Sequence, residues 1–334
     1  MIIAIDAMGG DHAPKATVEG AIQAAKDWPE LRIVLVGDRE KIEPFLINNP
    51  GNIEIRHASE VIATDEEPVK AVRRKKDSSL VVAVNMVKNK EVDAVISAGN
   101  TGAFMTAGLL ITGRMKGIER PALSPILPTT DGAGVLVLDA GANMDARPVH
   151  LKQYALMGSI YVEKVMGVSR PRVGLLNVGT EAKKGNELTK EAYSLLESSS
   201  VHFVGNVEAR DVTNHVCDVV VCDGFSGNIL LKSMEGLAGT FFSVMKQEFL
   251  KTTTGKIGAF LLKPAFKRIK LQMDYAEYGG ALLMGIRGTC IKAHGSSNPR
   301  AIRNAVLQAK KFVENDVNAL IAREIQEESG EVHV

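Results

Sequence analysis

Five apolar runs in the chain each end in a short turn of glycine and small polar residues. The runs begin at Asp93, Gly134, Arg172, Asp218 and Thr289. Backbone N–H groups in such turns, together with Asn, Ser, Thr and Lys side chains, can bind an anion. Continuous Val, Ile and Leu runs are typical of strands buried on both faces, as in a parallel sheet covered by helices. Because ligands bind beyond the carboxyl ends of such strands, the turns predict a phosphate-like group bound at a sheet edge.

The turn Gly99-Asn100-Thr101-Gly102 is the first candidate for that anion. A helix predicted from Gly102 to Lys116 begins within it, which directs free N–H groups and the positive end of the helix dipole at the sheet edge. The turn is not a P-loop, which requires Lys and Ser or Thr after its last glycine. The residues expected to contact the bound substrate come from this turn and its counterparts: Gly99, Asn100, Thr101, Gly102, Asn143, Gly179, Thr180, Lys183, Gly227 and His294.

Lys183 and Lys184 lie in a loop between two glycines, and Asn228 follows a glycine at a predicted helix start. Loop lysines are usually solvated, but a phosphate site benefits from a point charge, which favours at least one of the two pointing inward. The sequence leaves open which of them does so. Asn228 has two interpretations: the N-cap of its helix, or an amide that donates to a developing oxyanion.

His12 and His294 also lie in glycine turns and can move a proton near neutral pH. The chain has no Gly-x-Ser-x-Gly motif and no Cys/His pair in register, so no covalent nucleophile is indicated and we expect direct attack by a bound substrate. Asp6, Asp139 and Asp223 close three strands and could hold Mg²⁺, but capping of the backbone is the favoured interpretation. We expect neither a metal nor a cofactor.

Two basic segments are candidates for contacts with larger partners. Arg73, Arg74, Lys75 and Lys76 lie on a predicted helix, where such a run is either a solvated face or a docking site for an acidic protein. The segment 249–273 is basic and apolar and contains no acid. It predicts a helical hairpin that contacts either an anionic membrane or a second subunit, as equal alternatives. The membrane contact would use Lys256, Ile257, Phe260, Leu261, Leu262 and Lys263.

The composition limits the class of protein and its compartment. The chain has 334 residues, a net charge of +1 and only 5% aromatic residues, which disfavours nucleic acid as a partner. Its three cysteines lie within or beside apolar runs and favour a reducing cytoplasm over a disulfide framework. Met1 leads directly into an apolar strand, so we expect no signal peptide. No segment reaches the roughly 18 apolar residues of a membrane span.

Strand-like and helix-like segments alternate along the chain, which is the pattern of βαβ units. Strands are expected at Ile2–Ile5, Arg32–Val36, Ile53–Arg56, Asp93–Ser97 and Val201, and at the four later apolar runs. Helices are expected over Pro14–Lys26, Arg39–Leu46, Pro68–Lys88, Gly102–Lys116, Leu151–Val165, Glu187–Glu197, Gly227–Phe249 and Pro299–Glu327. We predict a single α/β/α catalytic domain over residues 1–334, built on one sheet, continuous or divided into lobes. A helical excursion is expected at about 235–280.

Eight segments combine into a specific pattern that spans the chain: Ile5–Pro14, Ala71–Ser79, Ser97–Ala103, Asn177–Glu181, Gly205–Asp211, Asp223–Asn228, Tyr278–Ala281 and Lys292–Ser297. This combination closely resembles the bacterial phosphate acyltransferases of the PlsX type. The resemblance implies that inorganic phosphate takes a long-chain acyl group from acyl-acyl-carrier protein. The products would be acyl phosphate, for phospholipid synthesis, and free carrier protein.

The resemblance has further implications for fold, partners and site. It implies a Rossmann-like fold related to phosphotransacetylases and to isocitrate and isopropylmalate dehydrogenases, a homodimer, and peripheral association with the cytoplasmic membrane. The lysine and asparagine implicated in catalysis in this family fall on Lys184 and Asn228. Given this resemblance, the basic run Arg73–Lys76 is the candidate docking site for the acidic carrier protein.

Two other functions are weighed against this one. A nicotinamide-dependent decarboxylating dehydrogenase of the related fold would need a clustered acidic Mg²⁺ site and a dinucleotide pocket, and the sequence shows neither pattern. A non-enzymatic adaptor between carrier protein and membrane would have little use for five polar turns at one sheet edge. The preferred acyl-chain length, the path of the acyl chain, assistance by a divalent metal and any sharing of the site between subunits are left open by the sequence.

Overall fold

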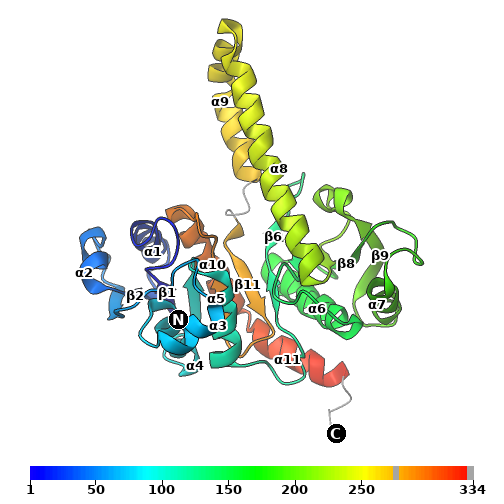
Figure 1. Ribbon diagram of the computed structural model, residues 1–334, viewed down its shortest axis with the longest axis horizontal. Coiled ribbons are helices and arrows are strands. Elements are labelled where there is room, and N and C mark those ends of the chain that lie inside the picture. The colour runs from blue at the N-terminus through cyan, green and yellow to red at the C-terminus, as the bar shows by residue number, and fades with distance from the viewer. Residues whose placement is uncertain (274–277, 329–334) are drawn as a thin grey trace.

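The computed structural model describes residues 1–273 and 278–328 and shows a two-lobed body from which a long helical hairpin projects (Figure 1). One lobe is built on a sheet of seven strands and the other on a sheet of five. The predicted α/β class is therefore confirmed. The prediction of one sheet is wrong, because the strands divide into two sheets.

The larger sheet has the order β3-β2-β1-β4-β12-β11-β5. From β3 to β12 its strands are parallel, and β11 is antiparallel to both of its neighbours. The strands are β1 (Ile2–Asp6), β2 (Arg32–Gly37), β3 (Ile53–His57), β4 (Ala94–Ser97), β5 (Ala122–Ser124), β11 (Ala281–Met284) and β12 (Thr289–Lys292). Ile3 and Ile5 pack in a core with α1 and α10, whereas Ala4 packs in a second core with α4. Burial on both faces explains why these strands are apolar throughout.

The smaller sheet has the order β6-β7-β10-β8-β9, in which only β6 is antiparallel to its neighbour. Its strands are β6 (Ile126–Leu127), β7 (Val135–Leu138), β8 (Arg172–Asn177), β9 (His202–Glu208) and β10 (Val219–Val221). Cys217 and Cys222 flank β10, and Cys290 lies in β12; all three are buried thiols, as predicted.

The segment from Ala122 to Leu127 joins the two sheets. Its first part, β5, pairs with β11, and its second part, β6, pairs with β7. In addition, the N–H of Ala140 donates to the carbonyl of Leu123 (2.9 Å). One hydrophobic core contains residues of both sheets, so the two lobes are packed together. The sequence analysis missed β5 and β6, which Pro125 separates, and it also missed β11.

The helices are α1 (Lys15–Asp27), α2 (Arg39–Ile42), α3 (Pro68–Arg74), α4 (Ser79–Lys88), α5 (Thr101–Ala107), α6 (Pro148–Tyr161), α7 (Glu187–Glu197), α8 (Gly224–Leu250), α9 (Thr253–Gln272), α10 (Pro299–Glu314) and α11 (Val317–Glu328). Two helices that were predicted as continuous are each broken. The first breaks after Arg74, and Ser78 caps the second half by accepting a hydrogen bond from the N–H of Val81 (3.4 Å). The second breaks at Asp316, which has a positive φ of 47°.

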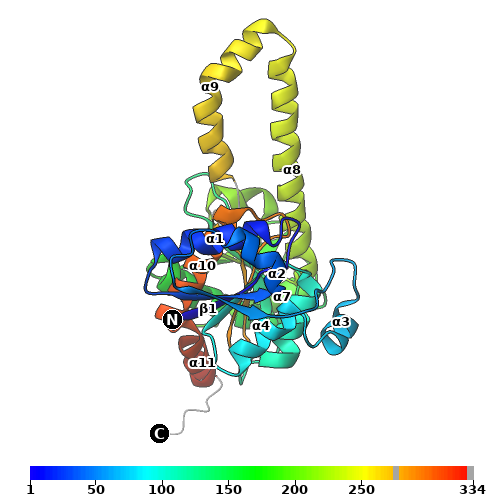
Figure 2. The same ribbon diagram turned by 90° about the vertical axis from the view of Figure 1, so that its left-hand side faces the viewer.

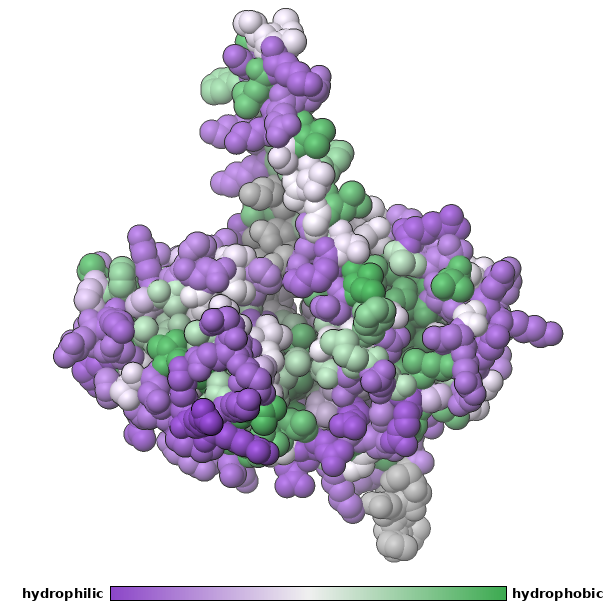
Figure 3. Space-filling view, viewed as in Figure 1, coloured by the Kyte–Doolittle hydropathy of each residue, from purple (hydrophilic) through white to green (hydrophobic). Residues whose placement is uncertain are grey.

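The projecting hairpin consists of α8 and α9, which run antiparallel away from the body (Figure 2). The segment 249–273 was expected to form a hairpin by itself; it supplies only the turn and one arm, because α8 forms the other. Hydrophobic and hydrophilic side chains are mixed along the projection (Figure 3). Residues 274–277 of the predicted excursion lie outside the described residues. Within the described chain, no helix combines the length and the apolar character that crossing a membrane requires.

Candidate active site

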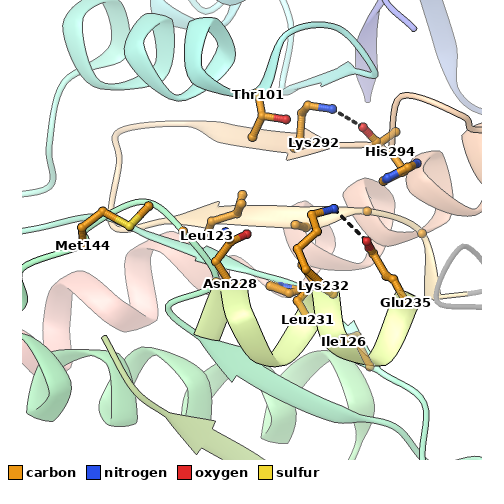
Figure 4. Close-up of a pocket in the computed structure, with 17 residues that line it drawn as sticks. Thr101, Leu123, Ile126, Met144, Asn228, Leu231, Lys232, Glu235, Lys292 and His294 are labelled. Carbon is orange, nitrogen blue, oxygen red and sulfur yellow. Dashed lines mark hydrogen bonds and ion pairs between the residues drawn. The ribbon is translucent and has the colours of Figure 1, made fainter. Parts of the chain in front are cut away.

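A cavity of about 320 Å³ lies at the junction of the two sheets (Figure 4). The larger sheet contributes Thr101 after β4, and Lys292 and His294 at the end of β12. The smaller sheet contributes Gly141 after β7 and Asn228 after β10. Four of the five predicted polar turns therefore meet beyond the carboxyl ends of parallel strands, where α/β sheets bind ligands.

Asn228 reaches this cavity because α8 begins very close to the end of β7. A Cβ atom on Gly227 would lie 1.9 Å from the carbonyl oxygen of Asp139, so only glycine permits the approach. Asp223 caps α8 by accepting hydrogen bonds from the N–H and hydroxyl of Ser226 (both 2.8 Å). The N-cap interpretation of Asn228 is therefore wrong. Its half-buried amide lines the cavity and makes no hydrogen bond within the described part of the chain.

In the turn after β4, Thr101 lines the cavity while its neighbours hold the turn in shape. The side-chain oxygen of Asn100 accepts a hydrogen bond from the N–H of Ala103 (2.9 Å), and its amide donates to three carbonyl groups in the loop 63–66. A Cβ atom on Gly102 would lie 2.6 Å from Pro68, at the start of α3. Asn100 and Gly102, both predicted to bind substrate, thus have structural roles beside the site.

The first loop of the chain supports this wall from behind. A Cβ atom on Gly9 would lie 2.6 Å from the backbone nitrogen of Gly99, so the two turns are in direct contact. The N–H of Asp11 donates to the carbonyl of Gly295 (2.8 Å). The loop therefore holds the turns after β4 and β12 together. His12, in the same loop, is exposed and does not line the cavity.

Asp139 fixes the turn after β7. Its carboxylate accepts hydrogen bonds from the N–H groups of Gly141 (3.1 Å) and Asn143 (2.6 Å). The amide of Asn143 donates to the carbonyl of Pro121 (2.6 Å) and to the hydroxyl of Tyr154 (3.0 Å), so this predicted substrate ligand is occupied in holding the turn.

The capping interpretation of the strand-end acids is confirmed. Asp139 and Asp223 cap turns as described, and Asp6 accepts hydrogen bonds from the N–H of Met8 (3.3 Å) and the Ser97 hydroxyl (2.6 Å). Among the residues that the structure describes, no three acidic, His or Cys side chains are grouped to hold a metal ion.

Lys292 is the most buried charged residue of the cavity wall, with 7% of its surface exposed. Its ammonium group donates to the carbonyl of Ala293 and forms no ion pair with a carboxylate of the described chain. Burial lowers the pKa of Lys292 to about 8, although Asp6 and Asp11 act in the opposite direction. A buried cation without an ion-pair partner is unfavourable until an anion arrives, so this wall favours anion binding.

Lys232 and His294 surround the same space. Lys232, on α8, pairs with Glu235 at 2.7 Å. Burial lowers the pKa of His294, Glu235 raises it, and the charges of Lys232 and Lys292 lower it further. Because the N–H of Ser296 donates to Nδ1 of His294, the neutral ring carries its proton on Nε2. Lys232, Lys292 and His294 thus lie close enough for the charge of one to shift the pKa of another. Such a cluster of groups that can be cationic is expected where a multiply charged anion binds.

The turn after β8 does not reach the cavity. Gly179, Thr180, Lys183 and Lys184 are absent from its lining, and both lysines are exposed. The loop that carries them borders a separate cavity of about 510 Å³, between the end of β8 and the start of α8.

The basic run on α3 divides into paired and free side chains. Lys75 forms an ion pair with Glu66 (2.6 Å), and Lys76 donates to the carbonyl of Val72 (3.3 Å). Arg73 and Arg74 are exposed and make no hydrogen bond or ion pair with described residues. Since α3 packs against α5, whose first residue lines the cavity, the two arginines lie on an element next to the site.

The sequence analysis missed Lys232 and Lys292, although each has a signal. Lys232 lies four residues after Asn228 and therefore on the same face of a helix. Lys292 closes an apolar strand immediately before the turn that contains His294. A lysine at the end of an otherwise apolar strand is a candidate for burial near a ligand. Lys292 was therefore as strong a candidate for the anion site as the loop lysines, Lys183 and Lys184.

Comparisons with known proteins bear on the activity. A family model described as "Fatty acid synthesis protein" matches residues 1–320. A phosphate acyltransferase of Brevibacillus brevis is 61% identical to the chain, covering 98% of each protein. A phosphate acyltransferase of Halalkalibacterium halodurans is 56% identical, covering 99% of this chain and all of its relative.

Comparison with solved structures bears on the fold alone. A phosphotransacetylase from Streptococcus pyogenes superimposes with a TM-score of 0.59 at 15% identity, covering 94% of both chains. The EutD phosphotransacetylase from Staphylococcus aureus gives 0.58 at 14% identity with the same coverage. These likenesses confirm the predicted Rossmann-like fold of the phosphotransacetylase kind.

Proposed function

The chain belongs to the fatty acid synthesis protein family of PlsX-type phosphate acyltransferases, and we propose that its acyl donor is long-chain acyl-acyl-carrier protein. The products are then acyl phosphate, which enters phospholipid synthesis, and free carrier protein. Residues 1–334 act as a single catalytic domain in the cytoplasm. Family membership favours this reaction over the dehydrogenase alternative. The observation that carries the proposal is the convergence on one cavity of two lysines, a histidine and an amide that has no hydrogen bond to a described residue.

Phosphate binds between two walls of the cavity. The larger sheet supplies Thr101 and Lys292, and α8 supplies Lys232. Lys292 supplies a buried charge, and Lys232 supplies a second charge that its pairing with Glu235 holds in position. The Thr101 hydroxyl lines the same space and can donate a hydrogen bond to the phosphate. Recognition by charge without a metal is consistent with the capping roles of the nearby acids.

The chemical step is a direct displacement at the thioester. A phosphate oxygen attacks the carbonyl carbon, forming a C–O bond and a tetrahedral oxyanion that accepts a hydrogen bond from the Asn228 amide. Collapse of this intermediate breaks the C–S bond and releases the thiolate, which takes up a proton to become the free thiol. The thiolate is a good leaving group, so holding the two substrates in register provides much of the remaining rate acceleration.

Lys184 is a further proposed catalytic residue, on the basis of the family motif. Its exposed position on the loop after β8 means that it would act on the substrate only if that loop approaches the cavity, or by attracting phosphate from solution. Lys183, its neighbour, is the alternative for the same role. Gly179 and Thr180 would then shape the loop in its substrate-bound form.

The proposed docking site for the carrier protein is the exposed pair Arg73 and Arg74. Both side chains lack partners among the described residues, and α3 packs beside the helix that opens at Thr101. An acidic carrier protein bound there would be positioned next to the entrance of the catalytic cavity. Such exposed charges increase the rate of association more than they increase affinity.

The hairpin is the proposed contact with an anionic membrane. Phe260 and Leu261 on α9 are 76% and 70% exposed, and Lys256 and Lys263 lie within one helical turn of them. A second subunit is the alternative cover for the same apolar face, and the family resemblance favours a homodimer in any case. Flotation with anionic and neutral vesicles, together with sedimentation, separates the two. A Phe260→Ser/Leu261→Ser variant should lose flotation with anionic vesicles and keep its mass; a change of mass with unchanged flotation would identify a subunit contact.

Free thiol release from acyl-carrier protein tests the proposed reaction. Purified protein should release the thiol only when inorganic phosphate is present, with formation of an equal amount of acyl phosphate that hydroxylamine traps as the hydroxamate. Sulfate should not replace phosphate. Thiol release without phosphate, or an acylated protein seen by mass spectrometry, would contradict direct attack. Calorimetry with NAD should show no binding; binding would instead support the dehydrogenase.

A further inference from the structure

A second, largely apolar cavity of about 350 Å³ adjoins the catalytic cavity. The two cavities share Leu231, Glu235 and His294 in their walls, so they are neighbours at that point. Among the residues that the structure describes, Glu235 and His294 are the polar side chains of the second cavity, and both also line the catalytic cavity. Away from the catalytic cavity it is lined by apolar residues of β6, α8 and the end of α9.

One face of α8 forms the floor of this second cavity. Leu231, Met234, Ala238 and Phe242 follow the spacing of a single helical stripe and all line it. Leu237 and Phe241 point elsewhere on the same helix, since they are 72% and 61% exposed and line neither cavity. The stripe starts one helical turn from Asn228 and leads away from the body along the hairpin (Figure 1).

We propose that this second cavity is the acyl-chain site: it binds the hydrocarbon tail of the acyl donor while the thioester carbonyl lies beside Asn228. The proposal rests on the proposed function, since the acyl group comes from that reaction. The tail is chosen as occupant because the apolar cavity lies directly beside the polar site where an acyl carbonyl must react. A partner subunit has no comparable reason to reach into a catalytic cavity.

The length of the site matches a long acyl chain. Asn228 and Phe242 are fourteen residues apart on α8, which corresponds to about 21 Å at about 1.5 Å per residue. An extended hydrocarbon chain advances about 1.25 Å per carbon, given single bonds of about 1.5 Å. The distance therefore accommodates about sixteen or seventeen carbons, the length of a palmitoyl group.

Gly239 offers a position at which this site can be shortened without damage to the fold. It lines the second cavity, and a Cβ atom added to it would meet nothing within 4 Å. It lies eleven residues beyond Asn228, or about 16 Å along the helix, which an extended chain reaches at about its thirteenth carbon. An octanoyl chain ends before Gly239, and a palmitoyl chain passes it.

Gly236 is the matched control, because it lies on the same helix, is equally open to an added side chain and lines neither cavity. Replacing either glycine with phenylalanine removes a poor helix former and should leave the fold intact. Gly239→Phe should lower kcat/KM for palmitoyl-carrier protein by about 50-fold or more. The added ring would keep about three terminal methylenes of the chain from being buried, and each buried methylene contributes about fourfold to kcat/KM. Its kcat/KM for octanoyl-carrier protein should change less than about twofold, and Gly236→Phe should match the parent chain with both donors.

The outcomes separate this inference from the function on which it rests. If the unmodified chain releases no thiol in a phosphate-dependent manner, the proposed function fails. If it is active but Gly239→Phe affects both donors equally, or neither, the acyl-chain assignment is wrong. A change in subunit number in Gly239→Phe, with an unchanged chain-length profile, would assign the cavity to a subunit contact and also overturn the inference.

Discussion

Lys292 and Lys184 each lie at or beyond the end of a parallel strand that leads into a polar turn, yet Lys292 is buried and Lys184 is exposed. Lys292 closes β12, which lies between β4 and β11 inside the larger sheet, and is 7% exposed. Lys184 lies seven residues beyond β8, which β10 separates from the strand at the junction, and it is exposed. The turn after β12 therefore lines the catalytic cavity, whereas the turn after β8 borders a separate one.

The two lysines also differ in what an arriving anion changes. The Lys292 ammonium has already lost most of its hydration without gaining an ion pair, so a bound phosphate stabilises a charge that burial had made unfavourable. Lys184 is solvated before and after, and an exposed ion pair contributes little. The cavity should therefore carry most of the binding and catalysis, and the loop after β8 a smaller share.

Substitution of Asn228 by alanine should have the largest effect. It removes the only unpaired amide that lines the cavity in the described chain, and loss of one oxyanion donor lowers kcat by about 100- to 1,000-fold. The KM for phosphate should change little, because phosphate is bound by the lysines. Steady-state kinetics of thiol release measure both parameters. A decrease in kcat below about fivefold would exclude the oxyanion role.

Lys292→Met should have the next largest effect, on phosphate binding. Loss of a charged hydrogen-bond donor should raise the KM for phosphate by about 10- to 100-fold. The melting temperature should stay constant or rise, because the lowered pKa of Lys292 means that its charge is unfavourable in the folded state. Reduced activity together with unreduced stability is not expected of a residue whose role is structural.

The pH dependence of the KM for phosphate gives a second readout for Lys292. Its folded-state pKa is lowered to about 8, so the charge is present below about pH 8 and lost as the pH rises through that value. In the unmodified chain the KM should therefore increase above about pH 8. Lys292→Met should remove this increase; the same increase in the variant would assign it to another group.

The sequence predicted the fold class and the convergence of four polar turns because both depend on local patterns. Apolar runs and the glycine turns after them are visible in a window of about ten residues. The division into two sheets depends on β5 and β6, which are too short for such a window. The burial of Lys292 depends on β4 and β11 pairing on both sides of β12, which is a property of the assembled sheet.

The different roles of asparagines in similar turns could not be predicted from the sequence either. Asn100, Asn143 and Asn228 are all asparagines in glycine-rich turns. In the structure the amides of Asn100 and Asn143 donate to nearby carbonyl groups, whereas that of Asn228 makes no hydrogen bond with a residue of 1–273 or 278–328. The difference arises from tertiary partners such as Pro121 and the loop 63–66, which lie 22 or more residues away in the sequence.

Lys184→Ala should lower kcat/KM by about tenfold if the loop after β8 approaches the substrate, since one partly solvated charge contributes about 1.4 kcal/mol at most. Lys183→Ala is the matched control in the same exposed loop and should change kcat/KM less than about twofold. The pair identifies which lysine acts. Full activity in Lys184→Ala would remove the loop from the mechanism and leave the cavity lysines as the whole of the phosphate site.

The smallest effect is expected from Arg73→Ser/Arg74→Ser, because exposed charges contribute about 0.2–1 kcal/mol each. The KM for acyl-carrier protein should rise about two- to tenfold at low salt, and the difference should shrink at high salt as the charges are screened. A small acyl thioester without the carrier protein should react at an unchanged rate. Lys88→Ser is the control, since Lys88 is exposed at the end of α4 and lies near Asp93, before the start of β4. If Lys88→Ser raises the KM for acyl-carrier protein equally, the effect is one of net charge and the carrier protein docks elsewhere. If only the arginine pair raises this KM, the exposed arginines bring the acyl donor to the cavity, where Lys292 and Lys232 bind phosphate.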